Sequence, residues 1–383
     1  MTFDWTLACS ACDATATAEG LPTVCPACGQ PWLVRYQRGM PDVKVRAEVR
    51  RGLGMWRFRP LLPIAPGEAP VTLGEGDTPL LPLPRIGEEY GIPDLWLKDE
   101  GANPTGSFKS RGMSAAVTRA VAAGASRFVV PTAGNAGVAL AAYASRAGCE
   151  AKVFAPRTTP ALLVRQARLF GAEVELVDGH IGDCGRLAAA WASETGAFNV
   201  STLREPYRIE GKKTLGLELA MQYNWELPDV IIYPTGGGTG LIGMWKAFEE
   251  LLVAGWVTGP PPRMFSVQSS GCAPVVRAFE AGADRCEPWT DPWTVASGLR
   301  VPGPLGDRLM LRALRESGGG AVALDDAELQ GEADRVTALE GIDLSPEGGA
   351  ALAAARRLRA RGAIGPDERV LVFNTGAGWL YRE

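Results

Sequence analysis

Histidine is almost absent from this sequence, since His180 is the only one among 383 residues. A single imidazole excludes most metal sites built from several histidines, and it leaves one residue for every mechanism that needs a histidine base. No Gly-x-Ser-x-Gly elbow occurs, and no Gly-Lys-Ser or Gly-Lys-Thr sequence follows a glycine-rich loop. The sequence therefore argues against serine hydrolases of the elbow type and against P-loop nucleotide hydrolases.

The chain also lacks an excess of positive charge and a long apolar run. Its 39 lysines and arginines against 43 aspartates and glutamates give a formal net charge of −4, with no basic cluster for a phosphodiester backbone. Residues 128–145 are uncharged, but Pro131, Asn135 and Gly137 interrupt them. The first residues place no basic segment before an apolar one, as a secretory signal does. We therefore expect a cytoplasmic protein that binds neither nucleic acid nor a membrane.

Short apolar segments that alternate with alanine-rich amphipathic segments predict the fold. Strands are expected at residues 95–98, 128–130, 152–154, 174–177, 230–233, 264–267 and 370–373, with helices after most of them, such as 135–146, and a long one at about 346–361. Residues 33–94, rich in proline and arginine, are interpreted as linker and wrapping segments. This alternation, in a chain longer than one core usually serves, predicts an α/β protein with two doubly wound parallel-sheet domains. Ligands of such folds bind in loops at the carboxyl ends of the strands.

Four of the eight cysteines form a pattern near the N-terminus. Two C-x-x-C turns, Cys9 with Cys12 and Cys25 with Cys28, can each aim two sulfurs at one tetrahedral ion. The segment is too short to bury a core of its own, so a bound metal would stabilise it instead. We expect a small zinc-ribbon-like module over residues 1–38 that holds a structural zinc ion. A redox pair, a ribbon without metal and disulfides stay open as alternatives.

The first loop of interest, residues 99–112, follows the strand expected at residues 95–98. Its Asn-Pro and Thr-Gly turns bring Ser107, Phe108 and Lys109 to the start of the next helix. The helix dipole disfavours an ammonium group at that position. This placement suits a lysine that acts as a nucleophile or carries a Schiff base. The ordinary alternative is a solvated lysine.

Two further loops end strands and begin helices. Residues 131–137 supply small residues and backbone N–H groups that suit a carboxylate, or else form an ordinary turn with Asn135 near the N-cap. Residues 234–243 carry glycines that let backbone amides converge on a phosphate without a lysine or arginine. They include a Gly-x-Gly-x-x-Gly sequence, but Gln268 stands after the next strand, where a dinucleotide site needs an acid. A monophosphate ester therefore fits this loop better than a pyrophosphate.

Together these loops offer a lysine that can react with an aldehyde, a site for a carboxylate and a site for a monophosphate. All three features fit pyridoxal phosphate with a bound amino acid. The chain resembles the fold-type II pyridoxal-phosphate enzymes, and most closely the threonine synthase family, in four motifs that stand in the family's order. These motifs are Asn103-Pro-Thr-Gly-Ser-Phe-Lys109, Thr132-Ala-Gly-Asn135, Gly236-Gly-Gly-Thr-Gly240 and Asn374-Thr375-Gly376. The resemblance covers nearly all of the chain after about residue 70, and the cysteine module resembles an N-terminal extension of some members. We place a large cofactor-binding domain at residues 39–112 with 205–383, and a smaller mobile domain at residues 113–204.

The resemblance implies a role for each matching residue. Lys109 corresponds to the lysine that bonds to the cofactor and later moves protons, and Phe108 to the aromatic residue beside the cofactor ring. Asn135 corresponds to the amide that binds the phenolic oxygen, and Thr375 to the hydroxyl that meets the pyridine nitrogen. The residues that match the phosphate cradle are Gly236, Gly237, Gly238, Thr239 and Gly240. Those that match the loop for the substrate carboxylate are Thr132, Ala133 and Gly134.

The resemblance also implies a reaction, the conversion of O-phospho-L-homoserine and water to L-threonine and phosphate. The chain departs from the family pattern at Ser110, where an aspartate is common, and at Gly240, where an amide is common. Of the residues that bind the substrate phosphate in the family, Arg208 is the one clearly retained, and its guanidinium could hold a phosphate bidentately.

Other activities use the same lysine, asparagine and glycine loop. A threonine or serine ammonia-lyase and a β-replacement enzyme acting on phosphoserine stay open as alternatives, as does a regulatory protein that binds pyridoxal phosphate without catalysis. We expect a small-molecule amino acid as substrate and, with eleven tryptophans available for the core and for interfaces, a homodimer.

Overall fold

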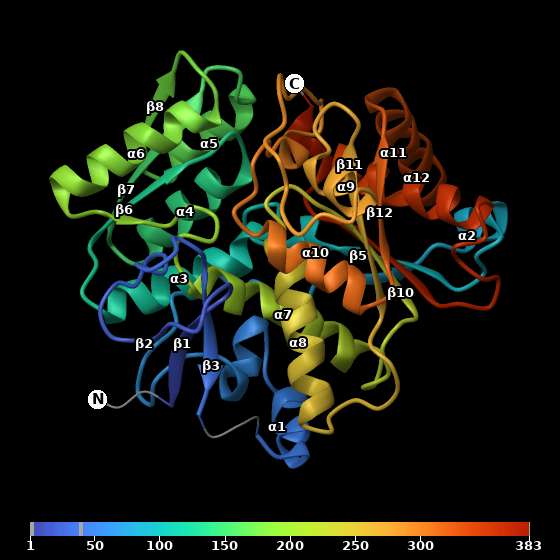
Figure 1. Ribbon diagram of the computed structural model, residues 1–383, viewed down its shortest axis with the longest axis horizontal. Helices are drawn as coiled ribbons and strands as arrows, with labels where there is room; N and C mark the ends of the chain where they lie inside the picture. Colours follow the sequence, from blue (N-terminus) through green and yellow to red (C-terminus); the bar gives the residue numbers. More distant parts are fainter. Residues whose placement is uncertain (1–3, 38–40, 383) are drawn as a thin grey trace. The chain divides into compact units, whose positions relative to one another are not determined.

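The computed structural model describes residues 4–37 and 41–382, which form an α/β protein (Figure 1). The chain divides into two compact units, each made of two stretches of sequence. Unit 1 comprises Met1–Asp77 and Lys109–Leu215, and unit 2 comprises Thr78–Phe108 and Gly216–Glu383. At the peptide bond between Phe108 and Lys109 the chain leaves unit 2 and enters unit 1. The domain limits of 39–112 with 205–383, and of 113–204, stay a prediction.

The N-terminal module of unit 1 is an antiparallel sheet with strand order β2-β1-β3. Its strands are β1 Trp5–Cys9, β2 Thr15–Thr17 and β3 Trp32–Tyr36. Trp5 pairs with Tyr36, and Cys9 pairs with Trp32. The expected small N-terminal module is therefore present. Cys9 ends β1, Cys12 lies between β1 and β2, and Cys25 and Cys28 lie between β2 and β3.

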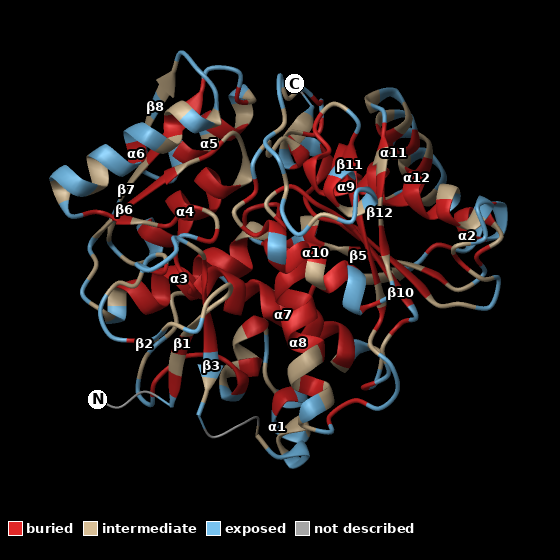
Figure 2. Ribbon diagram, in the orientation of Figure 1, coloured by how far each residue is buried: buried red, intermediate tan, exposed pale blue. Residues whose placement is uncertain are grey.

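The larger sheet of unit 1 is parallel throughout, with strand order β8-β7-β6-β9. Its strands are β6 Arg127–Pro131, β7 Glu150–Pro156, β8 Glu173–Val177 and β9 Phe198–Asn199. The helices of this unit include α1 Arg46–Arg51, α3 Lys109–Ala122, α4 Asn135–Arg146, α5 Ala161–Leu169 and α6 Ile181–Thr195. Helix α4 is largely buried and packs on both α3 and α5, whereas α6 has an exposed face (Figure 2).

Unit 2 is built on a six-stranded sheet with order β12-β11-β10-β13-β5-β4, in which only the β4 to β5 pair is antiparallel. The strands are β4 Leu80–Pro82, β5 Leu95–Asp99, β10 Val230–Pro234, β11 Arg263–Ser269, β12 Gly320–Leu324 and β13 Val370–Asn374. Its helices include α2 Pro84–Tyr90, α8 Thr239–Val253, α9 Pro274–Glu280, α10 Asp307–Glu316, α11 Asp326–Glu340 and α12 Pro346–Ala360. The central strands β10 and β13 are buried along their whole length and mostly apolar, as parallel strands covered on both faces are.

Helix α7, Tyr207–Gln222, contains the boundary between the units after Leu215. It is buried over most of its length (Figure 2). The sequence pattern did not predict this helix, nor α10, α11 and β12. In α7 and α11 polar and apolar residues are mixed around the helix, so the 3.6-residue periodicity is weak and the burial is not visible in the sequence. Helix α10 is clearly amphipathic, and that signal was available in the sequence.

The expectation that residues 33–94 form only linker and wrapping segments is wrong in part. Strands β3 and β4 and helices α1 and α2 lie there. Helix α2 begins with a proline at its first position and ends at Gly91, whose φ of 68° is the left-handed conformation that favours glycine. These elements are too short to produce a clear periodicity, and pairing with distant strands stabilises the two strands.

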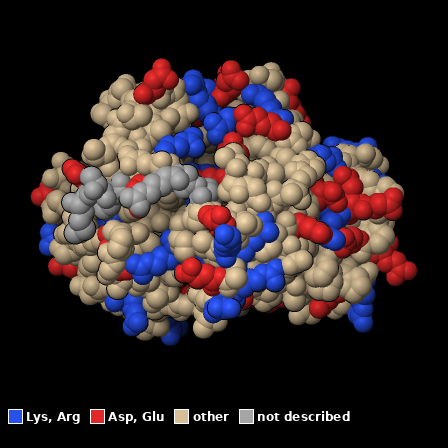
Figure 3. Space-filling model, turned by 90° about the horizontal axis from the view of Figure 1, so that it is seen from below, with Lys and Arg blue, Asp and Glu red and all other residues tan. Residues whose placement is uncertain are grey.

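Within the residues that the structure describes, no helix is long and apolar enough to cross a membrane. Lysine and arginine side chains are interspersed with aspartate and glutamate side chains over the face that Figure 3 presents.

Candidate active site

The loop that precedes Lys109 is joined to the loop after β13, both in unit 2. Ser107 and Gly376 form an isolated β-bridge. The N–H of Phe108 donates to the carbonyl oxygen of Thr375 at 3.0 Å. The N–H of Ala377 donates to the carbonyl oxygen of Gly106 at 2.8 Å. The structure therefore makes Phe108 and Thr375 neighbours at the carboxyl ends of β5 and β13, although the two come from separate motifs.

Buried charged and polar groups hold the start of the same loop. The Nζ atom of Lys98 lies 2.6 Å from Oε1 of Glu218, and both side chains are fully buried. The hydroxyl of Thr78 donates to Oε1 of Glu100 at 2.6 Å, and Nδ2 of Asn103 donates to Oε2 of Glu100 at 2.9 Å. Loss of one member of a buried ion pair leaves an uncompensated charge, so this network strongly disfavours other conformations of the loop.

The glycine loop of unit 2 connects β10 to α8. Its Gly238, with φ of 74°, is the N-cap residue of α8, and the first turn of that helix contains no acidic residue. A cap without a side chain leaves the first N–H groups of the helix to a ligand, and their partial positive charge favours an anion. A Cβ atom would lie 2.1 Å from the carbonyl oxygen of Gly298 if added to Gly236, and 1.9 Å from Oη of Tyr233 if added to Gly240. The loop must therefore present bare backbone.

In unit 1, Lys109 is the first residue of α3 and is partly buried. Helix α7 packs closely on the turn that follows it, because a Cβ atom on Gly211 would lie 2.1 Å from the carbonyl oxygen of Arg111. Arg111 is fully buried, and its Nη1 donates to the hydroxyl of Thr214 on α7 at 3.2 Å. Two helices thus fix the backbone position of the lysine within this unit.

The carboxylate loop, Thr132, Ala133 and Gly134, connects β6 to α4. The N–H of Thr132 donates to the carbonyl oxygen of Phe154 at 2.9 Å, and its hydroxyl accepts from the N–H of Gly134 at 3.1 Å. Gly134 is the N-cap residue, and Asn135 is the first residue of α4. Like Gly238 at the start of α8, Gly134 has no side chain that could accept hydrogen bonds from the first turn of its helix. The N-terminal N–H groups of α4 therefore suit an anion such as a carboxylate.

Arg208 is the second residue of α7 and is almost fully buried in unit 1, with 1% of its surface exposed. Its Nη1 donates to the carbonyl oxygen of Val200 at 2.6 Å, and the N–H of Val200 donates to the carbonyl oxygen of Val129 in β6 at 3.0 Å. Arg208 therefore lies at the carboxyl ends of β9 and β6, the edge of the sheet from which the carboxylate loop begins. Burial lowers the pKa of this guanidinium, and the nearby Glu205 opposes that effect.

Glu205 should make the stability of the protein depend on pH. Burial raises the pKa of this carboxyl group to about 7, although Arg208 and the N–H of Tyr207, 2.7 Å away, favour the charged form. A raised pKa means that the stabilising contribution is complete below the ordinary value of 4.5 and is lost as the pH rises through about 7.

The variant Glu205→Gln cannot titrate at this position. We expect the free energy of unfolding of the wild type, relative to that of Glu205→Gln, to fall by up to roughly 3 kcal/mol between pH 4.5 and pH 7.5. Urea unfolding at a series of pH values measures this difference. Parallel pH profiles for the two proteins would contradict the assignment.

The four N-terminal cysteines meet at one point. The Sγ atoms of Cys9 and Cys28 are 3.4 Å apart, those of Cys12 and Cys25 are 3.8 Å apart, and all four lie within 4.8 Å of one another. A tetrahedral zinc ion with Zn–S bonds of about 2.3 Å places its sulfurs about 3.8 Å apart. Burial opposes the ionisation of Cys9, but hydrogen bonds from the backbone of Ala11 and from neighbouring thiols lower its pKa to about 7. The set of donors and its spacing fit a structural metal ion.

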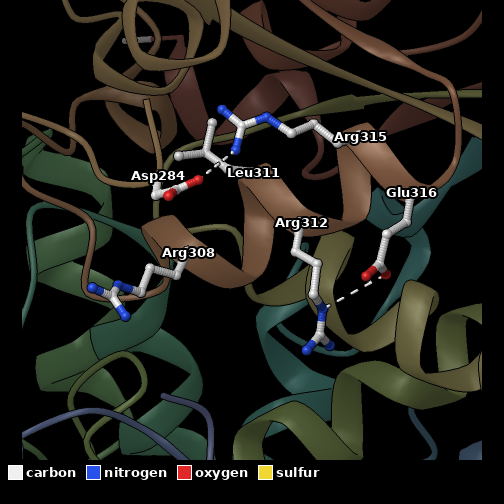
Figure 4. Close-up of a pocket in the computed structure, with 6 residues that line it drawn as sticks. All are labelled: Asp284, Arg308, Leu311, Arg312, Arg315 and Glu316. Carbon is white, nitrogen blue, oxygen red and sulfur yellow. Dashed lines mark hydrogen bonds and ion pairs between the residues drawn. The ribbon is translucent and has the colours of Figure 1, made fainter. Parts of the chain in front are cut away.

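A separate cavity of about 390 Å³ lies on α10 of unit 2 (Figure 4). Its lining residues are Asp284, Arg308, Leu311, Arg312, Arg315 and Glu316. Two of its arginines already pair with acids, because Arg315 lies 3.1 Å from Asp284 and Arg312 lies 3.7 Å from Glu316. None of the residues predicted from the sequence lines this cavity, so it is not the candidate active site.

Comparison with known proteins identifies the family. Residues 71–376 match the family described as "Pyridoxal-phosphate dependent enzyme". The chain is 34% identical over 371 residues to threonine synthase of Methanosarcina acetivorans, which covers 97% of this chain and 91% of that protein. It is also 34% identical over 373 residues to threonine synthase of Methanocaldococcus jannaschii, with the same coverage. This chain belongs to the threonine synthase family of pyridoxal-phosphate-dependent enzymes.

Solved structures confirm that this family member has the fold-type II fold. Maize serine racemase superposes with a TM-score of 0.69 at 22% identity, over 88% of this chain and 94% of that one. The L-serine ammonia-lyase of the fungus Rhizomucor miehei superposes with a TM-score of 0.66 at 23% identity, over 80% of this chain and 97% of that one. At these identities the likeness shows the fold alone.

The residues of this pyridoxal-phosphate-dependent enzyme fit its cofactor. The bare loop from Gly236 to Gly240 at the start of α8 has the shape and charge that a phosphate group needs, because a side chain at either end would collide with the protein itself. Phe108 and Thr375 lie together in the same unit, and the chain continues from Phe108 directly into Lys109. The individual assignments of Lys109, Asn135 and Thr375 to cofactor atoms stay predictions.

Two residues shape the glycine loop in a way that the sequence did not predict. Tyr233 fills the space beside Gly240, and Oε1 of Glu347 accepts from the N–H of Gly298 at 2.8 Å, while the carbonyl oxygen of Gly298 packs against Gly236. The position of Tyr233 near the carboxyl end of a buried strand was a usable signal, because side chains there reach the ligand loops. No local pattern connects Glu347 to a loop so far away in the sequence.

Replacement of Gly240 by alanine tests the close packing of the loop. The added Cβ atom would lie 1.9 Å from Oη and 2.3 Å from Cζ of Tyr233. We expect Gly240→Ala to lower the free energy of unfolding by about 1 to 3 kcal/mol and to weaken cofactor binding. Thermal unfolding and cofactor content measure the two effects. Gly331→Ala is the matched control, because nothing lies within 4 Å of its Cβ position on α11, and unchanged cofactor content in Gly240→Ala would contradict the prediction.

Proposed function

We propose that this enzyme is a threonine synthase, which converts O-phospho-L-homoserine and water to L-threonine and phosphate. The observation that carries the proposal is the similarity to proteins named threonine synthase, which extends over 97% of the chain. The proposal includes a structural zinc ion held by the four N-terminal cysteines.

Lys109 would act as the base of the reaction, with the cofactor as the electron sink. Bound pyridoxal phosphate supplies an electron sink that makes the α-proton of an amino acid removable. The Nζ atom of Lys109 takes that proton and then moves protons at the β-carbon, since a lysine beside a desolvated substrate has a neutral amine available as a base. Phe108, the residue before it, would pack beside the pyridine ring, and Thr375 would present a hydroxyl to the ring nitrogen.

Two sites in unit 1 hold the substrate. The N-terminal N–H groups of α4, with Thr132, Ala133 and Gly134, receive its carboxylate. Arg208 holds its phosphate, and its guanidinium is oriented for this by the hydrogen bond to Val200. The N-terminus of α4 and Arg208 lie at the same edge of the parallel sheet. One unit can therefore hold a substrate that has a carboxylate at one end and a phosphate at the other.

The experiment measures products from the purified, cofactor-loaded enzyme. We expect O-phospho-L-homoserine to yield threonine and phosphate in equal amounts, and L-threonine to yield no 2-oxobutyrate. Release of 2-oxobutyrate from L-threonine, without phosphate release from O-phospho-L-homoserine, would identify an ammonia-lyase and overturn the proposal. Consumption of O-phosphoserine with an added nucleophile would identify a β-replacement enzyme instead. Arg208→Lys, which keeps the charge and loses the planar fork, should raise KM for O-phospho-L-homoserine.

A further inference from the structure

Tyr233 lies between the aromatic residue beside the cofactor and the phosphate loop. It is the fourth residue of β10, and 1% of its surface is exposed. Its ring contacts that of Phe108 edge to face, with centroids 6.1 Å apart and planes at 82°. On the other side it contacts the ring of Phe373, with centroids 5.1 Å apart and planes at 66°. Two aromatic contacts therefore fix the direction of the phenol.

The hydroxyl end of Tyr233 reaches the first turn of α8. The position of a Cβ atom on Gly240 lies 1.9 Å from its Oη atom. Oη thus occupies the space into which a side chain at position 240, the second residue of the helix, would project. Gly240 is required there because of this phenol.

That turn is the part of the glycine loop where an anion binds best. Residues 236–243 contain no lysine, no arginine and no acidic residue, so an anion at this helix N-terminus depends on backbone N–H groups and on hydroxyls. The phenol of Tyr233 brings a hydroxyl donor to this turn from the preceding strand. Donation to a doubly charged phosphate is a strong hydrogen bond, since the acceptor is ionised.

We propose that Tyr233 is a further cofactor-binding residue, whose hydroxyl donates to the phosphate group of pyridoxal phosphate. Its ring, in contact with Phe108, also positions the aromatic residue that flanks the pyridine ring. This inference rests on the proposed role of the glycine loop as the phosphate cradle, and it does not depend on which amino acid the enzyme converts.

The test compares the wild type with Tyr233→Phe, which keeps both aromatic contacts and removes only the hydroxyl. We expect the dissociation constant of pyridoxal phosphate to rise about tenfold to a hundredfold, as for a lost hydrogen bond to a charged group. The dissociation constant of pyridoxal, which lacks the phosphate, should be unchanged. The ³¹P resonance of the bound cofactor should shift in Tyr233→Phe.

Tyr223→Phe is the matched control. Tyr223 is half-buried, its buried hydroxyl has no hydrogen-bond partner among the described residues, and its ring packs on Trp96 with centroids 6.0 Å apart. This control should bind pyridoxal phosphate as the wild type does. If Tyr233→Phe folds poorly, thermal unfolding will reveal it, and the ratio of the two dissociation constants within the variant still isolates the contribution of the phosphate.

Two outcomes would overturn the proposal. The first is equal binding of pyridoxal phosphate by Tyr233→Phe and wild type, which together with a raised KM for O-phospho-L-homoserine would place the hydroxyl at the phosphate of the substrate. The second is an equal loss of affinity for pyridoxal phosphate and for pyridoxal. Failure to form threonine would contradict the proposed function alone, because the binding measurements use no substrate.

Discussion

Replacing Lys109 with alanine is expected to abolish covalent attachment of the cofactor and to lower the rate of threonine formation by roughly 10⁴-fold or more, since the same amine is the attachment point and the base. Treatment with borohydride, denaturation and peptide mapping should find a pyridoxyl label on Lys109 in the wild type and none in the variant. The absorbance band of the covalently bound cofactor should disappear from the variant at the same time.

Lys44→Ala is a control for the label, because Lys44 is exposed in the 3₁₀ turn Val43–Val45. The label on Lys109 should be unaffected in this variant. A label at another lysine of the wild type, or full activity in Lys109→Ala, would contradict the assignment. The structure gives a reason to expect a folded variant, since Arg111 and the close approach of Gly211 hold the turn after Lys109.

The second large effect concerns the cysteine module. Replacing Cys25, the buried member of the four, with serine is expected to remove the metal ion and to lower the free energy of unfolding by about 3 kcal/mol or more, because a short module depends on its metal for stability. Metal analysis of the purified protein, and thermal unfolding with and without a chelator, measure the effect. Cys149→Ser is the control, since Cys149 lies outside the cluster.

The effect should extend beyond the module. The hydrophobic core of the module includes Ala116 of α3 and Tyr207 of α7, and the guanidinium of Arg119 lies over the rings of Trp5 and Tyr207 at 5.1 and 5.5 Å. Loss of the metal would expose these faces of the two helices that begin at Lys109 and next to Arg208. We therefore expect Cys25→Ser to lose cofactor as well. Purified protein without metal, together with equal melting of Cys25→Ser and wild type, would contradict the prediction.

A buried polar cluster also joins the module to α7. The hydroxyl of Tyr36 donates to Oε2 of Glu210 at 2.6 Å, and Nζ of Lys213 lies 2.8 Å from the same carboxylate. Both charged side chains are fully buried. Because such charges are stable only as a set, the last strand of the module is held in one position on the helix.

Much of the fold could be predicted from the sequence, because the signals are local. Buried parallel strands are continuous apolar segments, and those expected at residues 128–130, 230–233 and 370–373 lie in β6, β10 and β13. The helix expected at 135–146 has those limits in the structure. Two C-x-x-C turns identified the cluster of four cysteines, since each turn needs only four residues to place its sulfurs.

The amino-acid sequence by itself determined the fold class, the family and the order of the candidate loops. Strand composition, cysteine spacing and loop motifs are local signals, because each depends on only a few neighbouring residues. The tertiary structure alone decided that Thr375 lies beside Phe108, that Tyr233 requires glycine at position 240, and that the cysteine module shares its core with the helix of Lys109. These features depend on packing between residues far apart in the chain. Such packing leaves no local pattern, since the same residues would be equally acceptable in many other surroundings.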